Sequence, residues 1–157
     1  TLSLHDALPI CMLVEGRLDV ALINQYRFDS SHAPDGIFEV LAQQPLHWVC
    51  GSPVDIDPAT PVPLVTYSEG SPWRSATLET LDSAGRAYEF SYVCASYESL
   101  CSSVLAGFGI TALPEWDTGG RFVVLDGKGN LPPLPQVRTV LKTATSSPVL
   151  RCMRIPS

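Results

Sequence analysis

The sequence predicts an α/β fold in which short strands of a parallel sheet alternate with helices. The prediction rests first on the stretch from Glu89 to Pro114, whose pattern indicates a strand, a helix and a second strand. It rests also on fourteen prolines and eleven glycines, which indicate many turns and favour numerous short strands over a helical bundle. A chain of 157 residues can form one domain with a sizeable core or two small lobes.

The stretch that organises the chain begins with an apolar, aromatic strand over Phe90–Cys94. Ser96 follows at a position where its hydroxyl can cap a helix. Five residues then share the spacing of one helix face, namely Tyr97, Leu100, Cys101, Val104 and Leu105. Gly107 suits the left-handed residue that ends such a helix, and Ile110–Leu113 is predicted as the next strand. Two strands joined by a helix in this way are expected to be parallel.

The N-terminal part of the chain is expected to contribute one buried strand. Residues 1–10 fit no downstream pattern, so we expect a non-native leader there. Cys11–Gly16 is predicted as the end of a helix. Leu18–Ile23 is almost continuously apolar, which favours a parallel strand covered on both faces. A polar loop follows over Asn24–Gly36, and further strands are predicted at Ile37–Leu41, Leu46–Cys50, Leu64–Tyr67, Arg121–Leu125 and Val137–Lys142.

A second helix is predicted with Ser71 as its N-cap, Pro72 in its first position and Gly85 beyond its end. Gly51–Pro63 is rich in proline and aspartate, which is typical of a linker between lobes. We therefore expect a partial first lobe at 11–50 and 121–157 and a second lobe at 51–120. Leu131–Pro135 is either a rigid connector, which we favour, or a ligand for a proline-binding module.

Composition narrows the classes of function. The net charge is −6 and lysines and arginines form no cluster, so the chain by itself is not expected to bind nucleic acid. The five cysteines are widely spaced, which favours buried or incidental thiols over disulfides or a metal site. No signal peptide or membrane-spanning apolar run is evident, so we expect a cytoplasmic protein without membrane contact.

The sequence shows no pattern of known catalytic chemistry. It lacks the nucleophile-elbow, zinc-protease, phosphate-loop and dinucleotide-binding motifs. Its histidines are His5, His32 and His47, and the apolar neighbours of His47 favour an ordinary strand histidine over a catalytic one. We therefore expect that the protein is not an enzyme, binds no cofactor and has no metal site.

Binding is the chemistry that the sequence favours. Two serine-containing loops, Ser68–Ser71 and Ala95–Ser96, each follow a strand and precede a helix. In a parallel sheet such loops line the crevice at the carboxyl ends of the strands. Helix N-termini with hydroxyl groups suit an anion, although each serine can equally be a plain helix cap. The predicted ligand-binding residues are Asn24, Ser68, Gly70 and Ser96.

Arg74 lies in the first turn of the predicted second helix, where its charge opposes the helix dipole. Its partner could be a ligand anion or a carboxylate such as Glu69 or Glu98. An ordinary surface arginine is the alternative that we favour.

One motif and several further segments of the sequence resemble a known protein family. The pattern S-x-E-x-L-x-x-x-V-x-x-G-x-G-I-x-x-L-P, from Ser96 to Pro114, resembles the effector-binding domain of LysR-type transcriptional regulators. Similar segments continue the likeness from about Glu15 to Pro148, namely E-G-R-L-D-V-A-L-I, P-L-V-T-Y-S-E-G-S-P-W-R, A-G-R and L-P-P-L-P. Within the family, the chain most resembles a branch of motility and virulence regulators.

The resemblance implies a two-lobed α/β fold similar to periplasmic binding proteins of type 2, with a small-molecule effector held between the lobes. It implies that a full-length regulator self-associates and binds DNA through an N-terminal helix-turn-helix that this chain does not contain. It also implies an incomplete first lobe, so we expect apolar side chains such as Val20 and Leu22 to be exposed and the chain to be poorly stable. The rival interpretations are a periplasmic-type solute-binding protein and a small enzyme on the same fold.

Overall fold

The computed structural model describes residue 9 and residues 11–25, 36–115 and 118–144. Most of the expected leader, most of the polar loop before Gly36 and the C-terminal tail with Cys152 lie outside these residues. The chain divides into two compact units, one formed by 1–43 with 137–157 and the other by 44–136. These boundaries differ from those expected for the lobes, because residues 44–50 and 121–136 belong to the second unit. The assignment of lobes therefore stays a prediction.

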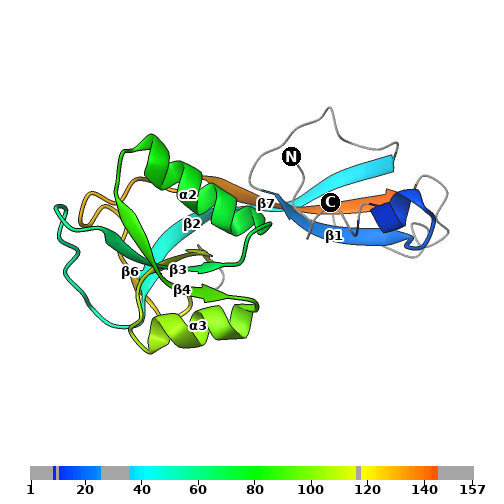
Figure 1. The fold of residues 1–157 in the computed structure, drawn as a ribbon. Helices are drawn as coiled ribbons and strands as arrows, with labels where there is room; N and C mark the ends of the chain where they lie inside the picture. Colours follow the sequence, from blue (N-terminus) through cyan, green and yellow to red (C-terminus); the bar gives the residue numbers. More distant parts are fainter. Residues whose placement is uncertain (1–8, 10, 26–35, 116–117, 145–157) are drawn as a thin grey trace. The chain divides into compact units, whose positions relative to one another are not determined.

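The first unit contains an antiparallel sheet. Strand β1 (Val20–Gln25) pairs with β7 (Gln136–Ala144), which lies next to β2 (Gly36–Cys50) in the strand order (Figure 1). Within β1, Ile23 is 3% exposed whereas Leu22 is 63% exposed. The prediction of a parallel strand covered on both faces is therefore wrong, and the exposure of Leu22 is as expected.

A small apolar cluster accompanies this sheet. Its buried members are Leu13, Ala21 and Ile23, and Leu18 packs against them. Residues 11–14 are helical, and Gly16 follows with a positive φ of 69°. The predicted helix end at Gly16 is confirmed, because a positive φ suits glycine at such a position.

The second unit is built around a parallel pair of strands. Strand β3 (Val62–Tyr67) leads through helix α2 (Pro72–Ser83) to β4 (Tyr88–Cys94), and helix α3 (Tyr97–Leu105) follows. In Figure 1, α2 and α3 lie on opposite sides of the two strands. This confirms the predicted strand-helix alternation.

Neighbouring residues of β3 contribute to two separate cores, because successive side chains of a strand point to opposite faces. Leu64 belongs to the cluster that contains Leu81 of α2, and Val65 belongs to the cluster that contains Leu100 of α3. Both β3 residues are fully buried. Leu105, predicted on the apolar face of α3, is 42% exposed because it lies at the last residue of the helix.

Strand β5 (Thr111–Pro114) corrects one prediction about pairing. It pairs antiparallel with β2, whereas the expectation was a parallel partner. Ile110, just before β5, makes a parallel bridge to Leu64, with its N–H donating to the Pro63 carbonyl over 2.9 Å. Gly109 permits this approach, since a Cβ there would lie 2.3 Å from the same oxygen.

The two strands predicted at Ile37–Leu41 and Leu46–Cys50 are one continuous strand, β2. The predicted strand at Arg121–Leu125 is shorter, with only β6 (Val123–Val124) paired to β2. No helix among the described residues is long and apolar enough to cross a membrane.

The proline-rich segment Leu131–Pro135 is fixed to the second unit. Leu131 is buried in the core, Leu134 packs against that core, and the Pro132 carbonyl accepts a hydrogen bond from the Trp48 indole over 2.7 Å. These contacts favour the interpretation as a rigid connector.

Candidate functional site

Two of the predicted binding loops meet at one edge of the second unit. Tyr67 and Cys94 are the last paired residues of the parallel strands β3 and β4. The N–H of Ser68 donates to the Cys94 carbonyl over 3.0 Å. The segments that follow β3 and β4 therefore begin side by side. Ser68, Gly70 and Ser96 therefore follow the carboxyl ends of adjacent strands, as the sequence predicts.

Ser96 is a helix cap, as predicted. Its Oγ accepts a hydrogen bond from the Ser99 N–H over 3.2 Å at the start of α3, and its side chain is exposed. A serine hydroxyl also carries one donor hydrogen, which capping does not use. Ser96 can therefore cap the helix and donate a hydrogen bond to a ligand at the same time.

The loop before α2 is shaped by Gly70, whose φ of 90° suits glycine. Ser71 occupies the predicted N-cap position, and Pro72 begins the helix. The N-cap position is confirmed, although the side chain of Ser71 makes no cap hydrogen bond within the described residues. Instead, the Ser71 carbonyl accepts hydrogen bonds from the N–H and hydroxyl of Ser75 over 3.1 and 3.3 Å.

Arg74 has partners other than the carboxylates considered from the sequence. Its Nη1 donates to the Tyr67 carbonyl over 2.9 Å, and its guanidinium carbon lies 4.5 Å from the centre of the Phe90 ring. This contact of a cation with an aromatic ring holds the half-buried arginine against β4. Arg74 thus fastens the start of α2 to the end of β3, close to the Ser68–Ser71 loop.

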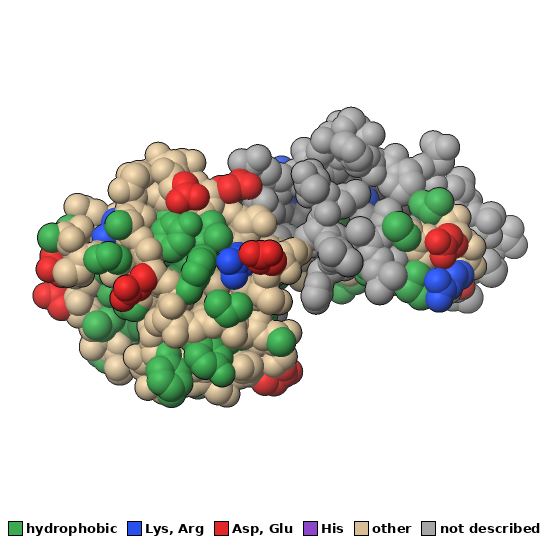
Figure 2. Space-filling view, viewed as in Figure 1, with side chains coloured by type: hydrophobic (Ala, Val, Ile, Leu, Met, Phe, Trp, Pro, Cys, Tyr) green, Lys and Arg blue, Asp and Glu red, His purple; other side chains and the backbone are tan. Residues whose placement is uncertain are grey.

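The outer strand β4 presents an apolar surface beside this edge. Figure 2 shows hydrophobic side chains gathered between α2 and α3 on this face of the second unit. Phe90, Tyr92 and Val93 are each between 44% and 48% exposed, and Tyr92 stacks on Phe108 with ring centres 5.7 Å apart.

Asn24 is not placed as the sequence predicts. It lies within β1, opposite Thr139 of β7, rather than after the end of a parallel strand. Its Oδ1 accepts a hydrogen bond from the Thr139 hydroxyl over 2.9 Å. Because β1 is antiparallel to its neighbour, the argument from parallel carboxyl ends does not apply to Asn24. This residue also belongs to the first unit, whereas the other three belong to the second.

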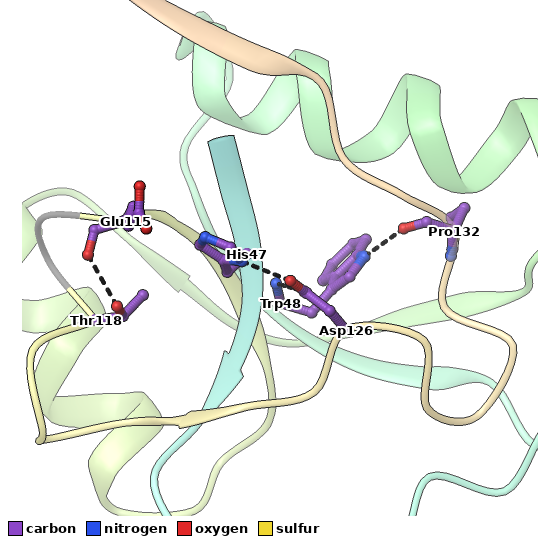
Figure 3. Close-up of polar contacts among 6 residues, drawn as sticks. All are labelled: His47, Trp48, Glu115, Thr118, Asp126 and Pro132. Carbon is purple, nitrogen blue, oxygen red and sulfur yellow. Dashed lines mark hydrogen bonds and ion pairs between the residues drawn. The ribbon is translucent and has the colours of Figure 1, made fainter. Parts of the chain in front are cut away.

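A polar network that the sequence did not indicate surrounds Trp48 (Figure 3). Asp126 accepts from the Trp48 N–H over 2.8 Å, and its other oxygen lies 2.5 Å from Nδ1 of His47. The Trp48 ring itself is buried, and its indole N–H donates to Pro132. The partners are about eighty residues apart in the chain, so no local pattern reveals the network. It gives His47 a structural partner, in line with the ordinary role that the sequence favours.

Arg86 was also missed, although it belongs to the A-G-R segment. It is 7% exposed, and its guanidinium donates to the carbonyls of Asp57, Thr60 and Gly129 over 2.6 to 3.2 Å. A fork of N–H donors suits several carbonyls at once. Arg86 thereby ties together loops that are distant in sequence.

The described cysteines are free thiols, with Cys50, Cys94 and Cys101 buried and Cys11 exposed. Burial raises the pKa of the Cys50 thiol, which favours its protonated form. Within the described parts of the chain, no group of three or more histidine, cysteine or acidic residues could hold a metal ion.

The sequence is similar to a known protein family and to a known regulator. The profile of the family described as LysR substrate binding domain matches residues 2–154. The HTH-type transcriptional regulator PecT of Dickeya dadantii (strain 3937) is 30% identical over 130 residues, which cover 83% of this chain and 39% of PecT. The chain thus spans about two fifths of the length of this relative.

Solved structures show the same fold. The apo regulatory domain of HypT from Salmonella typhimurium superposes with a TM-score of 0.75 at 22% identity, covering 93% of this chain and 74% of that chain. Vibrio fischeri DarR, solved in complex with DNA, gives a TM-score of 0.70 at 19% identity, covering 88% of this chain and 49% of that chain. The expected α/β fold, similar to periplasmic binding proteins, is confirmed. The chain belongs to the LysR substrate-binding domain family, the effector-binding domains of LysR-type transcriptional regulators.

Proposed function

We propose that the edge formed by Ser68, Gly70 and Ser96 binds a small organic anion that acts as the effector. The observation that carries the proposal is the hydrogen bond from Ser68 to Cys94, which brings both loops to the carboxyl ends of β3 and β4. The N-terminus of α3 offers a partial positive charge there, and the Ser96 hydroxyl retains a donor hydrogen.

The carboxylates around this edge limit the negative charge that the ligand can carry. Glu69 is exposed directly after Ser68, and Glu98 lies in the first turn of α3. Both carboxylates would repel a multiply charged anion. The proposal is therefore for a ligand with a single anionic group and an apolar or polar neutral body.

We further propose that effector binding modulates DNA binding by a helix-turn-helix elsewhere in a self-associating cytoplasmic regulator, and that the chain catalyses no reaction. The regulator PecT and the DNA complex of DarR support this role. The net charge of −6 supports the proposal that another part of the regulator binds DNA and that this chain does not. Tight, salt-sensitive binding of this chain to duplex DNA would contradict the proposal.

The site is tested with Ser96→Ala in the full-length regulator, with Ser71→Ala as the matched control. Thermal unfolding is measured across a panel of small monocarboxylates. We expect Ser96→Ala to lose about 1 kcal/mol of stability as a cap and, in addition, to reduce the melting shift caused by the carboxylate that stabilises the parent protein. Ser71→Ala should retain that shift. An equal ligand-induced shift in the parent and Ser96→Ala would reduce Ser96 to a cap.

We also propose Asn24, in the first unit, as a ligand-binding residue in its own right, and it is tested separately. Its Oδ1 is bound to Thr139, but an amide group also carries two donor hydrogens. Asn24→Ala should weaken the response to the same carboxylate. An unchanged response would confine the site to the second unit.

A further inference from the structure

Backbone carbonyl oxygens from separate segments of the second unit surround the Arg86 side chain. This side chain is buried, and each of its three nitrogens donates to a carbonyl. Nη1 donates to Thr60 over 2.6 Å and lies 3.5 Å from the Ala87 oxygen. Nη2 donates to Asp57 over 3.0 Å, and Nε donates to Gly129 over 3.2 Å. These four carbonyls form a cage around the guanidinium group.

The carbonyl cage holds a positive charge without a carboxylate. Among the described residues, no acidic side chain forms an ion pair with Arg86. Asp57 contributes its backbone oxygen, while its carboxylate accepts a hydrogen bond from the Ala59 N–H over 2.9 Å. A buried charge must be paired or hydrogen-bonded. The cage therefore suits a cation that presents several N–H groups in one plane, which is the geometry of guanidinium.

A turn fixes one side of the cage without help from the arginine side chain. The N–H and the hydroxyl of Thr60 both donate to the Asp57 carbonyl over 3.3 Å. Two residues later, the Val62 N–H donates to the Ala87 carbonyl over 2.9 Å at the start of β3. Three of the four cage carbonyls thus belong to residues that other hydrogen bonds hold in place.

A second turn fixes the carbonyl of Gly129. The Lys128 N–H donates to the Leu125 carbonyl, and the Leu131 N–H donates to the Lys128 carbonyl, each over 2.9 Å. Gly129 is also pressed against the buried side chain of Ile56, since a Cβ at this glycine would lie 2.4 Å from it. Packing therefore joins the two sides of the cage in addition to the arginine.

We infer that the carbonyl cage is a guanidinium-binding site whose built-in ligand is Arg86, and that it binds free guanidinium ion when this side chain is removed. Arg86→Ala leaves the carbonyl oxygens held by the two turns and by Ile56. Free guanidinium offers the same planar set of donors, whereas an ammonium group is a compact point charge and urea is neutral. The inference is independent of which ligand binds the Ser96 edge.

The first test measures thermal unfolding of Arg86→Ala in the full-length protein in millimolar guanidinium chloride, with sodium chloride at equal ionic strength as the reference. We expect the variant to melt below the parent protein. Guanidinium should then raise its melting temperature by a few degrees with a saturating dependence, because a ligand of the folded state stabilises that state. The parent protein, whose cage is occupied, should show no rise. A variant that melts equally in both salts would overturn the inference.

Arg17→Ala is the matched control, because Arg17 forms an exposed pair with Glu15. This variant should show no rise in guanidinium chloride. Urea and ammonium chloride at the same concentrations should leave the melting temperature of Arg86→Ala at its reference value. A rise of equal size in Arg17→Ala, or in either of these solutes, would reveal a general solvent effect and contradict a specific site.

A second measurement uses the unmodified full-length protein and holds whether or not Arg86→Ala folds. The Nε proton of Arg86 should exchange with water at least about tenfold more slowly than that of Arg17, because burial and the hydrogen bond to Gly129 shield it. Equal exchange of the two protons would show that the cage does not hold the guanidinium group, and would overturn the inference.

Discussion

Strand β3 of the second unit and strand β1 of the first unit differ in how completely their side chains are buried. In the second unit, β3 is covered by α2 on one face and by α3 on the other, and two apolar clusters result. In the first unit, β7 is buried at Val140, Leu141, Lys142 and Thr143, but β1 alternates between buried and exposed side chains and contributes to one small apolar cluster. Since burial of apolar surface is the main source of folding free energy, stability should be concentrated in the second unit.

The difference also bears on function. Three of the four predicted binding residues follow β3 and β4, whose layers hold them in place, whereas Asn24 lies on a strand with one exposed face. A binding edge on a rigid scaffold keeps its geometry without a ligand. We therefore expect the second unit to determine which ligand binds.

The largest expected effect comes from a substitution in the core of the second unit, compared with one on the exposed face of β1 in the first unit. Leu64→Ala removes a fully buried side chain of β3 and should cost about 3 kcal/mol of unfolding free energy. Leu22→Ala, on the exposed face of β1, should change it by less than about 0.5 kcal/mol. Urea denaturation of both variants measures the contrast, and equal losses would contradict it.

A glycine in a crowded place should give the next largest effect. A Cβ at Gly51 would lie 2.4 Å from the Val104 carbonyl oxygen, so Gly51→Ala forces α3 away from the end of β2. Overpacking of this kind typically costs about 1–3 kcal/mol. Gly119→Ala is the matched control, since no described atom lies within 4 Å of a Cβ there. If both alanines are tolerated equally in a melting experiment, the packing of α3 is looser than described.

Arg86→Met tests a polar tie of the second unit. The substitution leaves the carbonyls of Asp57, Thr60 and Gly129 without their buried donor and should cost about 2 kcal/mol. Arg17→Met removes an exposed pair with Glu15 in the first unit and should cost well under about 1 kcal/mol. A larger loss for Arg17→Met in chemical denaturation would reverse the comparison.

The smallest effect is a pH dependence of the second unit. Burial raises the pKa of Tyr88 above its ordinary value of 10.0, and the nearby Asp82 raises it further. The folded state therefore holds this proton more tightly than the unfolded state, so stability falls as pH rises from about 10 through the folded pKa. Tyr88→Phe should make the loss between pH 9 and pH 11 shallower. An unchanged slope would show that Tyr88 does not contribute.

Local patterns predicted what depends on neighbours in sequence. The cap at Ser96, the first residue of α2 at Pro72 and the turn at Gly16 are set by side chains a few residues apart. The loops at Ser68 and Ser96 could be brought together from the sequence because parallel strands present their carboxyl ends at one edge.

Features that depend on distant partners could not be predicted. The apolar run of β1 resembles a buried parallel strand, but its pairing with β7 decides its direction and leaves Leu22 exposed. The Asp126 carboxylate and the Arg86 guanidinium find backbone partners tens of residues away, and no spacing indicates such contacts. Arg74 likewise binds the Tyr67 carbonyl and the Phe90 ring, which only the folded sheet brings within reach.

Native-state hydrogen exchange tests the contrast between the units most directly. The amides of Leu64 and Val65 in β3 should open only with global unfolding, whereas those of Leu22 and Ile23 in β1 should exchange through a smaller opening of the first unit. The account predicts protection at least tenfold greater in β3 than in β1, with denaturant lowering the protection of β3 more steeply. Equal protection and equal denaturant dependence in both strands would contradict it.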